Sequence, residues 1–153
     1  MKVEKVDHIH IGVKDLDNAV GFFSDLFETT FSEILQTGAE QDTRGTVCDL
    51  GGVGLELFTG LTPDGWMSKL IEKRGEGFFG MSFKVPNIDE AIAEVEARGL
   101  RIVERVAIGN AIEAHIHPKD TYGTLIELVQ YEAQHPGVAQ ALNKGYDRYR
   151  PEE

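Results

Sequence analysis

Two histidines and two glutamates of this chain combine metal-binding side chains with a regular spacing. His8 and His10 are separated by one residue in the segment VDHIHIGV, and Glu56 and Glu127 each lie in an apolar-Glu-Leu triplet. On a strand, two residues with one residue between them point to the same face, so a His-X-His pair can chelate one ion. Imidazole and carboxylate ligands together suit Zn, Fe, Ni, Co or Mn. The residues predict a divalent metal site of His8, Glu56 and Glu127, completed by His10 or water.

Each of these side chains also has a second interpretation. His10 could be a polar residue that only lines a cavity, and the HIH segment at 115–117 is another His-X-His pair. Glutamates that alternate with apolar residues on a strand usually face water. Glu56 and Glu127, however, occupy matching places in a sequence repeat. We therefore expect both carboxylates inside a cavity, where they need a metal, a proton or a cationic partner.

The repeat is incomplete at one position of the expected site. Two gap-free alignments define it: residues 7–20 onto 79–92, and residues 51–58 onto 122–129. Glu56 falls on Glu127, but His8 falls on Gly80, which has no side chain to offer. Two copies of one module predict a site at their interface. The glycine is expected to leave a coordination position and side-chain volume free beside that site.

Periodicity predicts the elements that position these residues. Alternating apolar and polar residues predict strands near 6–13, 31–37, 44–50, 53–58, 78–85, 101–107, 111–117 and 123–131. Helices are predicted from Asp15 or Asp17, from Asn87 to about Arg98, and, as a shorter segment, over MSKLIEKR at 67–74. The expected organisation is a first β-α-β-β-β module at 1–60, a linker at 61–76, a second module at 77–131 and a polar tail at 132–153.

Net charge, apolar segments and cysteine content limit the kinds of partner that the chain can have. A net charge of −11 argues against a nucleic-acid partner, because binding phosphates needs clustered lysine and arginine. No segment has the apolar core of a signal peptide or the length of a membrane span. Cys48 is the single cysteine, which excludes an internal disulfide. These features predict a cytoplasmic protein that acts on a small molecule, with no nucleic-acid or membrane partner.

The paired modules, with His on a first strand and Glu on a fourth, resemble the vicinal oxygen chelate superfamily. That group includes glyoxalase I, methylmalonyl-CoA epimerase, extradiol dioxygenases and antibiotic-resistance proteins. The resemblance covers about residues 5–131 and is closest to the epimerases, whose sequences are similar in SKLIEKRGEGF and HPKDTYGTLIEL. It implies an α+β fold in which two modules form an open eight-stranded barrel. It also implies a divalent metal in the barrel, with Phe79 and Gly80 where the epimerases carry His-His.

The resemblance implies a reaction as well as a fold. An isomerase, epimerase or lyase of this kind would abstract a proton next to a carbonyl or acyl thioester. Glu56 or Glu127 would act as the base, and His117 is a further catalytic candidate. A non-haem iron dioxygenase is the second possibility, since His8 and His10 could supply the two imidazoles that such a site needs. A metal-free binding or resistance protein on the same fold is the third.

Three further residues are expected to contact the substrate. Trp66 and Phe79 could form an apolar wall. Lys73, beside Lys69 and Arg74, forms a local basic patch on an otherwise acidic chain and could contact an anionic group. A homodimer is expected.

Overall fold

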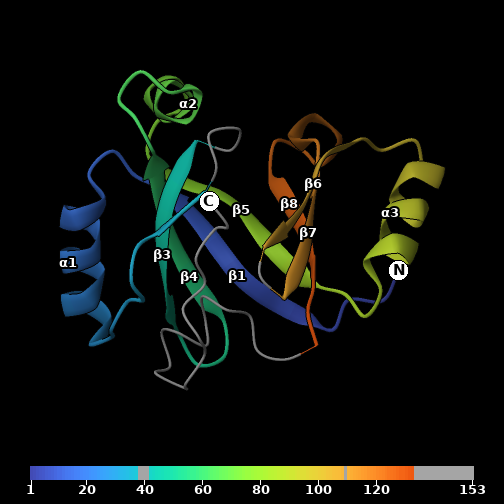
Figure 1. Ribbon diagram of the computed structural model, residues 1–153, viewed down its shortest axis with the longest axis horizontal. Helices are drawn as coiled ribbons and strands as arrows, with labels where there is room; N and C mark the ends of the chain where they lie inside the picture. The colour runs from blue at the N-terminus through green and yellow to red at the C-terminus, as the bar shows by residue number, and fades with distance from the viewer. Residues whose placement is uncertain (38–41, 109, 133–153) are drawn as a thin grey trace.

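The computed structural model describes residues 1–37, 42–108 and 110–132. Within them, one eight-stranded mixed sheet has the strand order β2-β3-β4-β1-β5-β8-β7-β6. Figure 1 shows the sheet curling into a half-barrel, with two helices outside it and a third at one rim. The α+β fold with an open eight-stranded barrel, expected from the sequence, is confirmed.

The elements follow one another in the order β1 (Lys5–Gly12), α1 (Leu16–Phe27), β2 (Leu35–Gln36), β3 (Thr43–Asp49), β4 (Gly54–Gly60), α2 (Trp66–Arg74), β5 (Gly77–Lys84), α3 (Ile88–Ala97), β6 (Ile102–Ile108), β7 (Ala111–Ile116), the 3-10 helix η1 (Pro118–Asp120) and β8 (Leu125–Gln130). Each half therefore runs β-α-β-β-β, and α2 lies between the halves in the chain.

The strand register shows that the two halves are structural equivalents. β1 pairs with β4 in parallel, and β5 pairs with β8 in the same way. In the first half His10 lies opposite Glu56, and in the second half Ser82 lies opposite Glu127. The antiparallel pairing of β1 with β5 joins the halves, with His8 opposite Ser82. This arrangement is the pseudo-twofold symmetry that the gap-free alignments predict.

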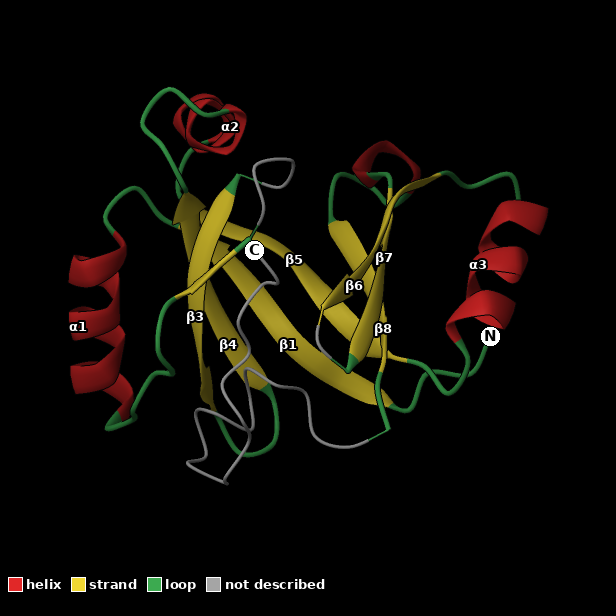
Figure 2. Ribbon diagram, in the orientation of Figure 1, coloured by secondary structure: helices red, strands yellow, loops and turns green. Residues whose placement is uncertain are grey.

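The two long helices cover the convex side of the sheet (Figure 2). α1 starts at Asp15, whose carboxylate accepts a hydrogen bond from the Asn18 amide at 3.0 Å. α3 starts at Asn87, whose side chain accepts from the amides of Asp89 and Glu90. These side chains satisfy amides that the first turn of a helix leaves without partners. One apolar cluster lies under each helix, so the concave side is left for a cavity.

Two local features differ from the expected elements. The strand expected near 31–37 is reduced to Leu35–Gln36, and residue Ser32 instead joins β3 through its amide and the carbonyl of Val47. The short helix η1 was not anticipated. The expected polar tail lies almost wholly outside the described residues. None of the helices in the described part of the chain is long and apolar enough to span a membrane.

Replacement of Leu128 by alanine tests the packing of the second module. Leu128 in β8 is 1% exposed and belongs to the apolar cluster under α3. We expect Leu128→Ala to lower the free energy of unfolding by about 2–5 kcal/mol, because it removes buried methyl groups and leaves a cavity. Leu50→Ala, at a side chain that is 39% exposed just after β3, is the control and should change it by less than about 0.5 kcal/mol. Equal effects in urea unfolding would contradict the assigned core.

Candidate functional site

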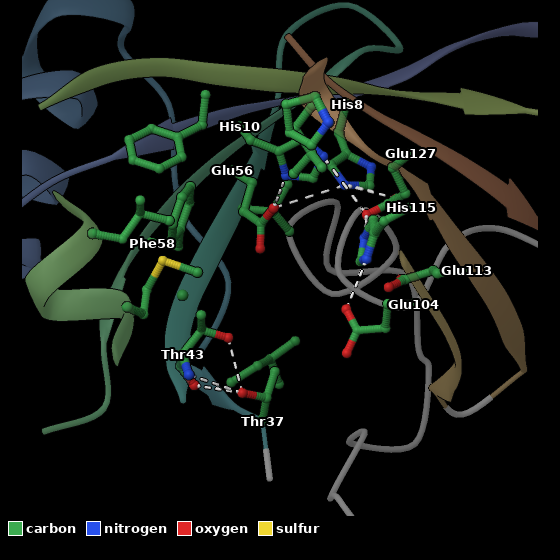
Figure 3. Close-up of a pocket in the computed structure, with 18 of the residues that line it drawn as sticks. His8, His10, Thr37, Thr43, Glu56, Phe58, Glu104, Glu113, His115 and Glu127 are labelled. Carbon is green, nitrogen blue, oxygen red and sulfur yellow. Dashed lines mark hydrogen bonds and ion pairs between the residues drawn. The ribbon is translucent and has the colours of Figure 1, made fainter. Parts of the chain in front are cut away.

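A cavity of about 340 Å³ lies on the concave side of the sheet, between the two modules and next to α2. One side of it is apolar, with Val47, Phe58, Met67, Leu70 and Phe79 among the lining residues. The other side holds ionisable groups: His8, His10, Glu56, Glu104, Glu113, His115 and Glu127 (Figure 3). The cavity thus combines a surface for a hydrocarbon group with a cluster that can hold charge or a metal ion.

The three histidine rings of the cavity are oriented in the same way. Each has its Nδ1 atom hydrogen-bonded to a different carboxylate: His8 to Asp7 at 2.9 Å, His10 to Glu56 at 2.5 Å and His115 to Glu104 at 2.8 Å. A carboxylate at Nδ1 fixes the ring and directs Nε2 toward whatever the ring binds, which is the usual arrangement around protein-bound metals.

The Nε2 atoms of the three rings all approach the carboxylate of Glu127. The distances are 3.5 Å from His8 to Oε1, and 3.7 Å from His10 and 2.9 Å from His115 to Oε2. Glu127 is 3% exposed, and Figure 3 shows it between the β1 histidines and His115. The structure therefore brings together His8, His10 and Glu127 from the predicted set, with Glu56 at the edge of the cluster.

The donor atoms of this cluster suit a divalent metal. Ligand atoms of His8, His10 and Glu127 lie within 4.8 Å of one another. Nε2 of His10, Oε1 of Glu127 and the hydroxyl of Ser82 are buried without a hydrogen-bond partner in the described part of the chain. Buried polar atoms are seldom left in this condition, and a cation between them would satisfy them. Two imidazoles and one carboxylate form a donor set for iron, cobalt, nickel, manganese or zinc.

Glu56 has a different position from Glu127. Its Oε2 atom bonds to Nδ1 of His10 and lies 3.8 Å from Nε2 of His8. Its side chain is 31% exposed, whereas that of Glu127 is 4% exposed. Glu56 therefore orients His10 and also presents a carboxylate to the open part of the cavity. As a metal ligand, Glu56 stays a prediction.

A β-bulge places Asp7 behind His8. Along β1, Val6 pairs with Phe83 and His8 with Ser82, so Asp7 is an extra residue with no partner of its own in the ladder. A bulge alters the usual alternation of side chains. It lets the fully buried Asp7 carboxylate reach the ring of its own neighbour, while the hydroxyl of Tyr131 donates to its other oxygen.

The charged groups of the cluster stabilise one another. Burial opposes ionisation of Glu56, but the hydrogen bond and charge of His10 outweigh it and lower the pKa of Glu56. Burial also acts on Glu127, yet the charge of His8 and the hydrogen bond of His115 hold its pKa well below the usual value. Burial would lower the pKa of His115, but its hydrogen bonds with Glu104 and Glu127 raise that pKa to about 10. The metal-free cluster therefore carries ionised carboxylates and a protonated His115 at neutral pH.

The volume expected beside Gly80 does not exist, so that expectation was wrong. Gly80 pairs with His10 on one side and with Leu125 on the other. A Cβ atom on Gly80 would lie 2.1 Å from the backbone oxygen of Leu125, far inside van der Waals contact. The close approach of β8 fills the space that a side chain would need. A histidine at this position would therefore force the two strands apart before it could bind a metal.

The residues expected to contact substrate are divided between the cavity and the surface. Phe79 and Trp66 line the cavity. Lys73 is exposed on α2 and lies outside the cavity lining in the described chain, whereas Arg74 is part of the lining. The guanidinium of Arg74 stacks 4.2 Å from the centre of the Phe79 ring. Lys73 therefore stays a prediction, and Arg74 is the basic residue nearest to the apolar wall.

His117 is separated from the cluster in the described structure. It stands at the start of η1, where its Nδ1 accepts a hydrogen bond from the Lys119 amide at 3.0 Å. It is not among the described residues that line the cavity. The structure thus gives His117 a role in ending β7, and its catalytic role stays a prediction.

Sequence reasoning missed three members of the cluster, Asp7, Glu104 and Glu113, and named His115 only as half of a second His-X-His pair. His115 lies directly opposite Glu127 in the pairing of β7 with β8. The sequence predicts that Glu127 faces the cavity. Pairing the strand of Glu127 with the strand before it would have placed His115 on the same face. Asp7 and Glu104 carried no such signal, because each depends on a register shift in its strand.

Removal of the Asp7 carboxylate tests its role behind His8. We expect Asp7→Asn to weaken divalent-metal binding by about 10- to 100-fold, because the ring of His8 loses the partner that orients it. Isothermal titration of chelator-treated protein measures the affinity. Asp25→Asn, at an exposed position on α1, is the control. Unchanged affinity in a folded Asp7→Asn protein would contradict this role.

The hydrogen bonds of His115 predict a pH dependence of stability. The pKa of His115 in the folded protein, about 10, exceeds the ordinary value of 6.5. The ion pairs therefore stabilise the metal-free protein fully below about pH 6.5, and the effect is lost as the pH rises toward 10. The difference in unfolding free energy between wild type and His115→Gln should shrink across this range. Denaturant unfolding in the presence of chelator measures it, and a difference that grows with pH would contradict the assignment.

Several known proteins are similar to this chain in sequence and architecture. Mouse mitochondrial methylmalonyl-CoA epimerase is 27% identical over 136 residues, which cover 84% of this chain and 74% of that protein. The structure of methylmalonyl-CoA epimerase from Mycobacterium tuberculosis matches with a TM-score of 0.76 at 26% identity, covering 86% of this chain and 90% of that one. A methylmalonyl-CoA epimerase in complex with methylmalonyl-CoA and NH4+ matches with a TM-score of 0.75 at 26% identity, covering 88% and 99%.

A family model covers most of the chain. The model described as the Glyoxalase/Bleomycin resistance protein/Dioxygenase superfamily matches residues 7–116. That segment runs from Asp7 through β7, so it takes in the first module and the second module up to, but not including, β8. Together with the half-barrel and its His-Glu cluster, the match shows that this protein belongs to the glyoxalase/bleomycin resistance protein/dioxygenase superfamily.

Proposed function

We propose that this protein is an epimerase of acyl-CoA thioesters, which removes and returns the proton on the carbon next to the thioester carbonyl. The likeness to methylmalonyl-CoA epimerases supports this class of reaction. The observation that carries the proposal is the position of Glu56. An ionised, partly exposed carboxylate stands between the histidine cluster and the apolar wall, where the reacting carbon of an acyl group would lie.

The residues His8, His10 and Glu127 would hold a divalent metal, with Asp7 and Glu56 fixing the two rings. A metal bound there would act as a Lewis acid and lower the free energy of the negative charge that develops on a carbonyl oxygen. The fixed rings need no rearrangement when that charge appears, because their Nδ1 atoms are already hydrogen-bonded.

Proton transfer would use the accessible carboxylates on the two walls of the cavity. Glu56 on β4 accepts the proton, since its lowered pKa keeps it ionised. Epimerisation also requires a proton to return to the opposite face of the planar carbon. Glu104 on β6, with a side chain that is 37% exposed across the cavity (Figure 3), would donate that proton from its carboxylic acid form and be left as a carboxylate, while Glu56 keeps the abstracted proton. Glu127 is too enclosed for either task, which makes it a ligand in this proposal.

The apolar wall would hold the substituent on the reacting carbon. Phe58 and Phe79 pack edge to face with their ring centres 5.1 Å apart, and Met67 packs against them. Burial of a hydrocarbon group on this wall would orient the substrate and remove water from the neighbouring carboxylate. Arg74, beside Phe79 at the end of α2, would meet an anionic part of the ligand.

A second candidate follows from the two-histidine, one-carboxylate set itself. This set is the donor group of non-haem iron oxygenases, and the superfamily of the chain includes dioxygenases. An iron-dependent dioxygenase would consume dioxygen, whereas the proposed epimerase would not. A metal-free binding protein would show neither activity and would lack bound metal after purification without chelator.

Deuterium exchange tests the proposed reaction. Metal-loaded protein in deuterium oxide should add one mass unit to 2-substituted acyl-CoA thioesters in a panel that includes methylmalonyl-CoA. Glu56→Gln should slow this exchange by about 10²- to 10⁴-fold, the usual contribution of a general base. Glu96→Gln, at an exposed position on α3, should leave it unchanged.

Metal content measured in the same Glu56→Gln samples separates the two roles of this residue. A retained metal with slow exchange supports a base, and a lost metal supports the ligand role that the sequence predicts. If no member of the panel exchanges and the protein takes up oxygen in an iron-dependent manner, it is a dioxygenase and the epimerase proposal is wrong.

The expected homodimer and cytoplasmic location remain part of the proposal. Three apolar side chains on the outer side of α1 support a self-association surface. Phe22, Leu26 and Phe27 are 60%, 57% and 45% exposed.

A further inference from the structure

Glu127 lies between two groups of possible ligands, and the proposed function uses only one of them. His8 and His10 approach it from β1. On its other side stand Glu113 and His115 of β7, and ligand atoms of these two residues and Glu127 lie within 4.8 Å of one another. In the described part of the chain, no set within that distance contains all three histidines. One ion therefore cannot bind all three rings as they stand.

The ligands of the second group are buried and oriented toward a common point. Glu113 and His115 alternate with Ala114 on β7, so both face the cavity, and His115 is paired with Glu127 in the adjoining strand. Glu113 is 7% exposed. His115 Nε2 and Glu127 Oε2 are 2.9 Å apart, close to the separation of about 3 Å between neighbouring ligands that each lie near 2.1 Å from a metal.

His115 is held in the same way as the two histidines of the first group. Glu104 bonds its Nδ1 atom, as Asp7 bonds His8 and Glu56 bonds His10. Glu104 thereby fixes the ring with its Nε2 atom directed at Glu127. In addition, Oε1 of Glu127 is buried with no hydrogen-bond partner among the described residues. This oxygen lies 3.5 Å from Nε2 of His8, whereas Oε2 lies 2.9 Å from Nε2 of His115, so the carboxylate reaches both groups.

The charge of the cavity exceeds what one divalent ion can offset. Glu56, Glu104, Glu113 and Glu127 line the cavity, and Arg74 is the one lysine or arginine in its described lining. The Arg74 guanidinium lies over the Phe79 ring on the apolar wall. One divalent ion offsets two of these four negative charges, and the protonated His115 of the metal-free cluster offsets a third. A second divalent ion, bound in place of that proton, makes the cluster neutral.

The symmetry of the fold shows that the second group is specific to one module. Val47 faces Glu56 as His115 faces Glu127, and Gly45 holds the place of Glu113 two residues earlier. The first module thus has no ligand at either position. The second module has both, although it lacks a ligand at Gly80. Chain symmetry alone therefore does not account for Glu113 and His115.

We propose that Glu113, His115 and Glu127 bind a second divalent cation, which Glu127 bridges to the ion held by His8 and His10. Pairs of divalent ions bridged by a carboxylate usually lie about 3.5–4 Å apart and can stabilise two oxygens of one substrate. This inference concerns binding alone, so it stands or falls independently of the epimerase reaction.

Metal stoichiometry tests the proposal without any substrate. Chelator-treated protein is dialysed against Co²⁺ or Mn²⁺, and bound metal per chain is measured by native mass spectrometry and elemental analysis. We expect two ions in wild type, one in Glu113→Gln and one in His8→Gln. Bridged Mn²⁺ pairs should also broaden the electron paramagnetic resonance spectrum of wild type, and the broadening should disappear in Glu113→Gln.

Matched variants control for folding and for weak surface binding. Glu96→Gln removes an exposed carboxylate and should still bind two ions. His115→Gln is the second variant at the proposed site if Glu113→Gln fails to fold by circular dichroism. One ion per wild-type chain at saturation would overturn the proposal even if deuterium exchange occurs. Two ions that persist unchanged in folded Glu113→Gln and His115→Gln would overturn it as well.

Discussion

The antiparallel pairing of β1 with β5 is the contact on which the rest of the structure depends. It joins the two modules, and each of its strands also pairs in parallel with the strand that carries a cavity glutamate. Side chains on a strand alternate between faces, so a slip of one residue would turn His8 and His10 from the cavity to the helical layer. The apolar cluster under α1 opposes that slip, because Ile9 and Ile11, which pack against it, would then face the cavity.

The fold could be predicted from the sequence because its information is local and repeated. Alternation marks the strands, Asp15 and Asn87 begin the two outer helices, and the repeat relates the halves. The positions of His8 and Glu127 on the cavity side follow from the same alternation. These signals need no knowledge of which strands become neighbours.

The composition of the candidate site was less predictable because it depends on strand register. Asp7 reaches His8 through a bulge in β1, and a shift between Ile102 and Glu104 in β6 places Glu104 opposite His115. Periodicity assumes an unbroken ladder, so it puts such residues on the wrong face or assigns them no partner. The division of the basic patch, with Arg74 in the cavity and Lys73 outside it, depends on how α2 lies against β4.

The two modules share a topology but contribute different chemistry. The first supplies the histidines of β1 and, with α2, most of the apolar wall. The second supplies the buried carboxylate at the centre and the polar residues of β6 and β7. A site between two halves can become asymmetric in this way without altering either backbone, because each half keeps its own core under its own helix.

The contact between Gly80 and Leu125 makes this asymmetry hard to reverse. Once β8 lies against the bare backbone of β5, any side chain at Gly80 meets the carbonyl of Leu125. A symmetric site could be rebuilt only by moving a strand and replacing a residue together, and either change alone would lower stability. A side chain at Gly45 of β3 would also meet backbone, because its Cβ would lie 2.9 Å from the carbonyl oxygen of Leu57. For protein engineering, the cavity-lining Val47 on β3 is therefore a more accessible position than either glycine.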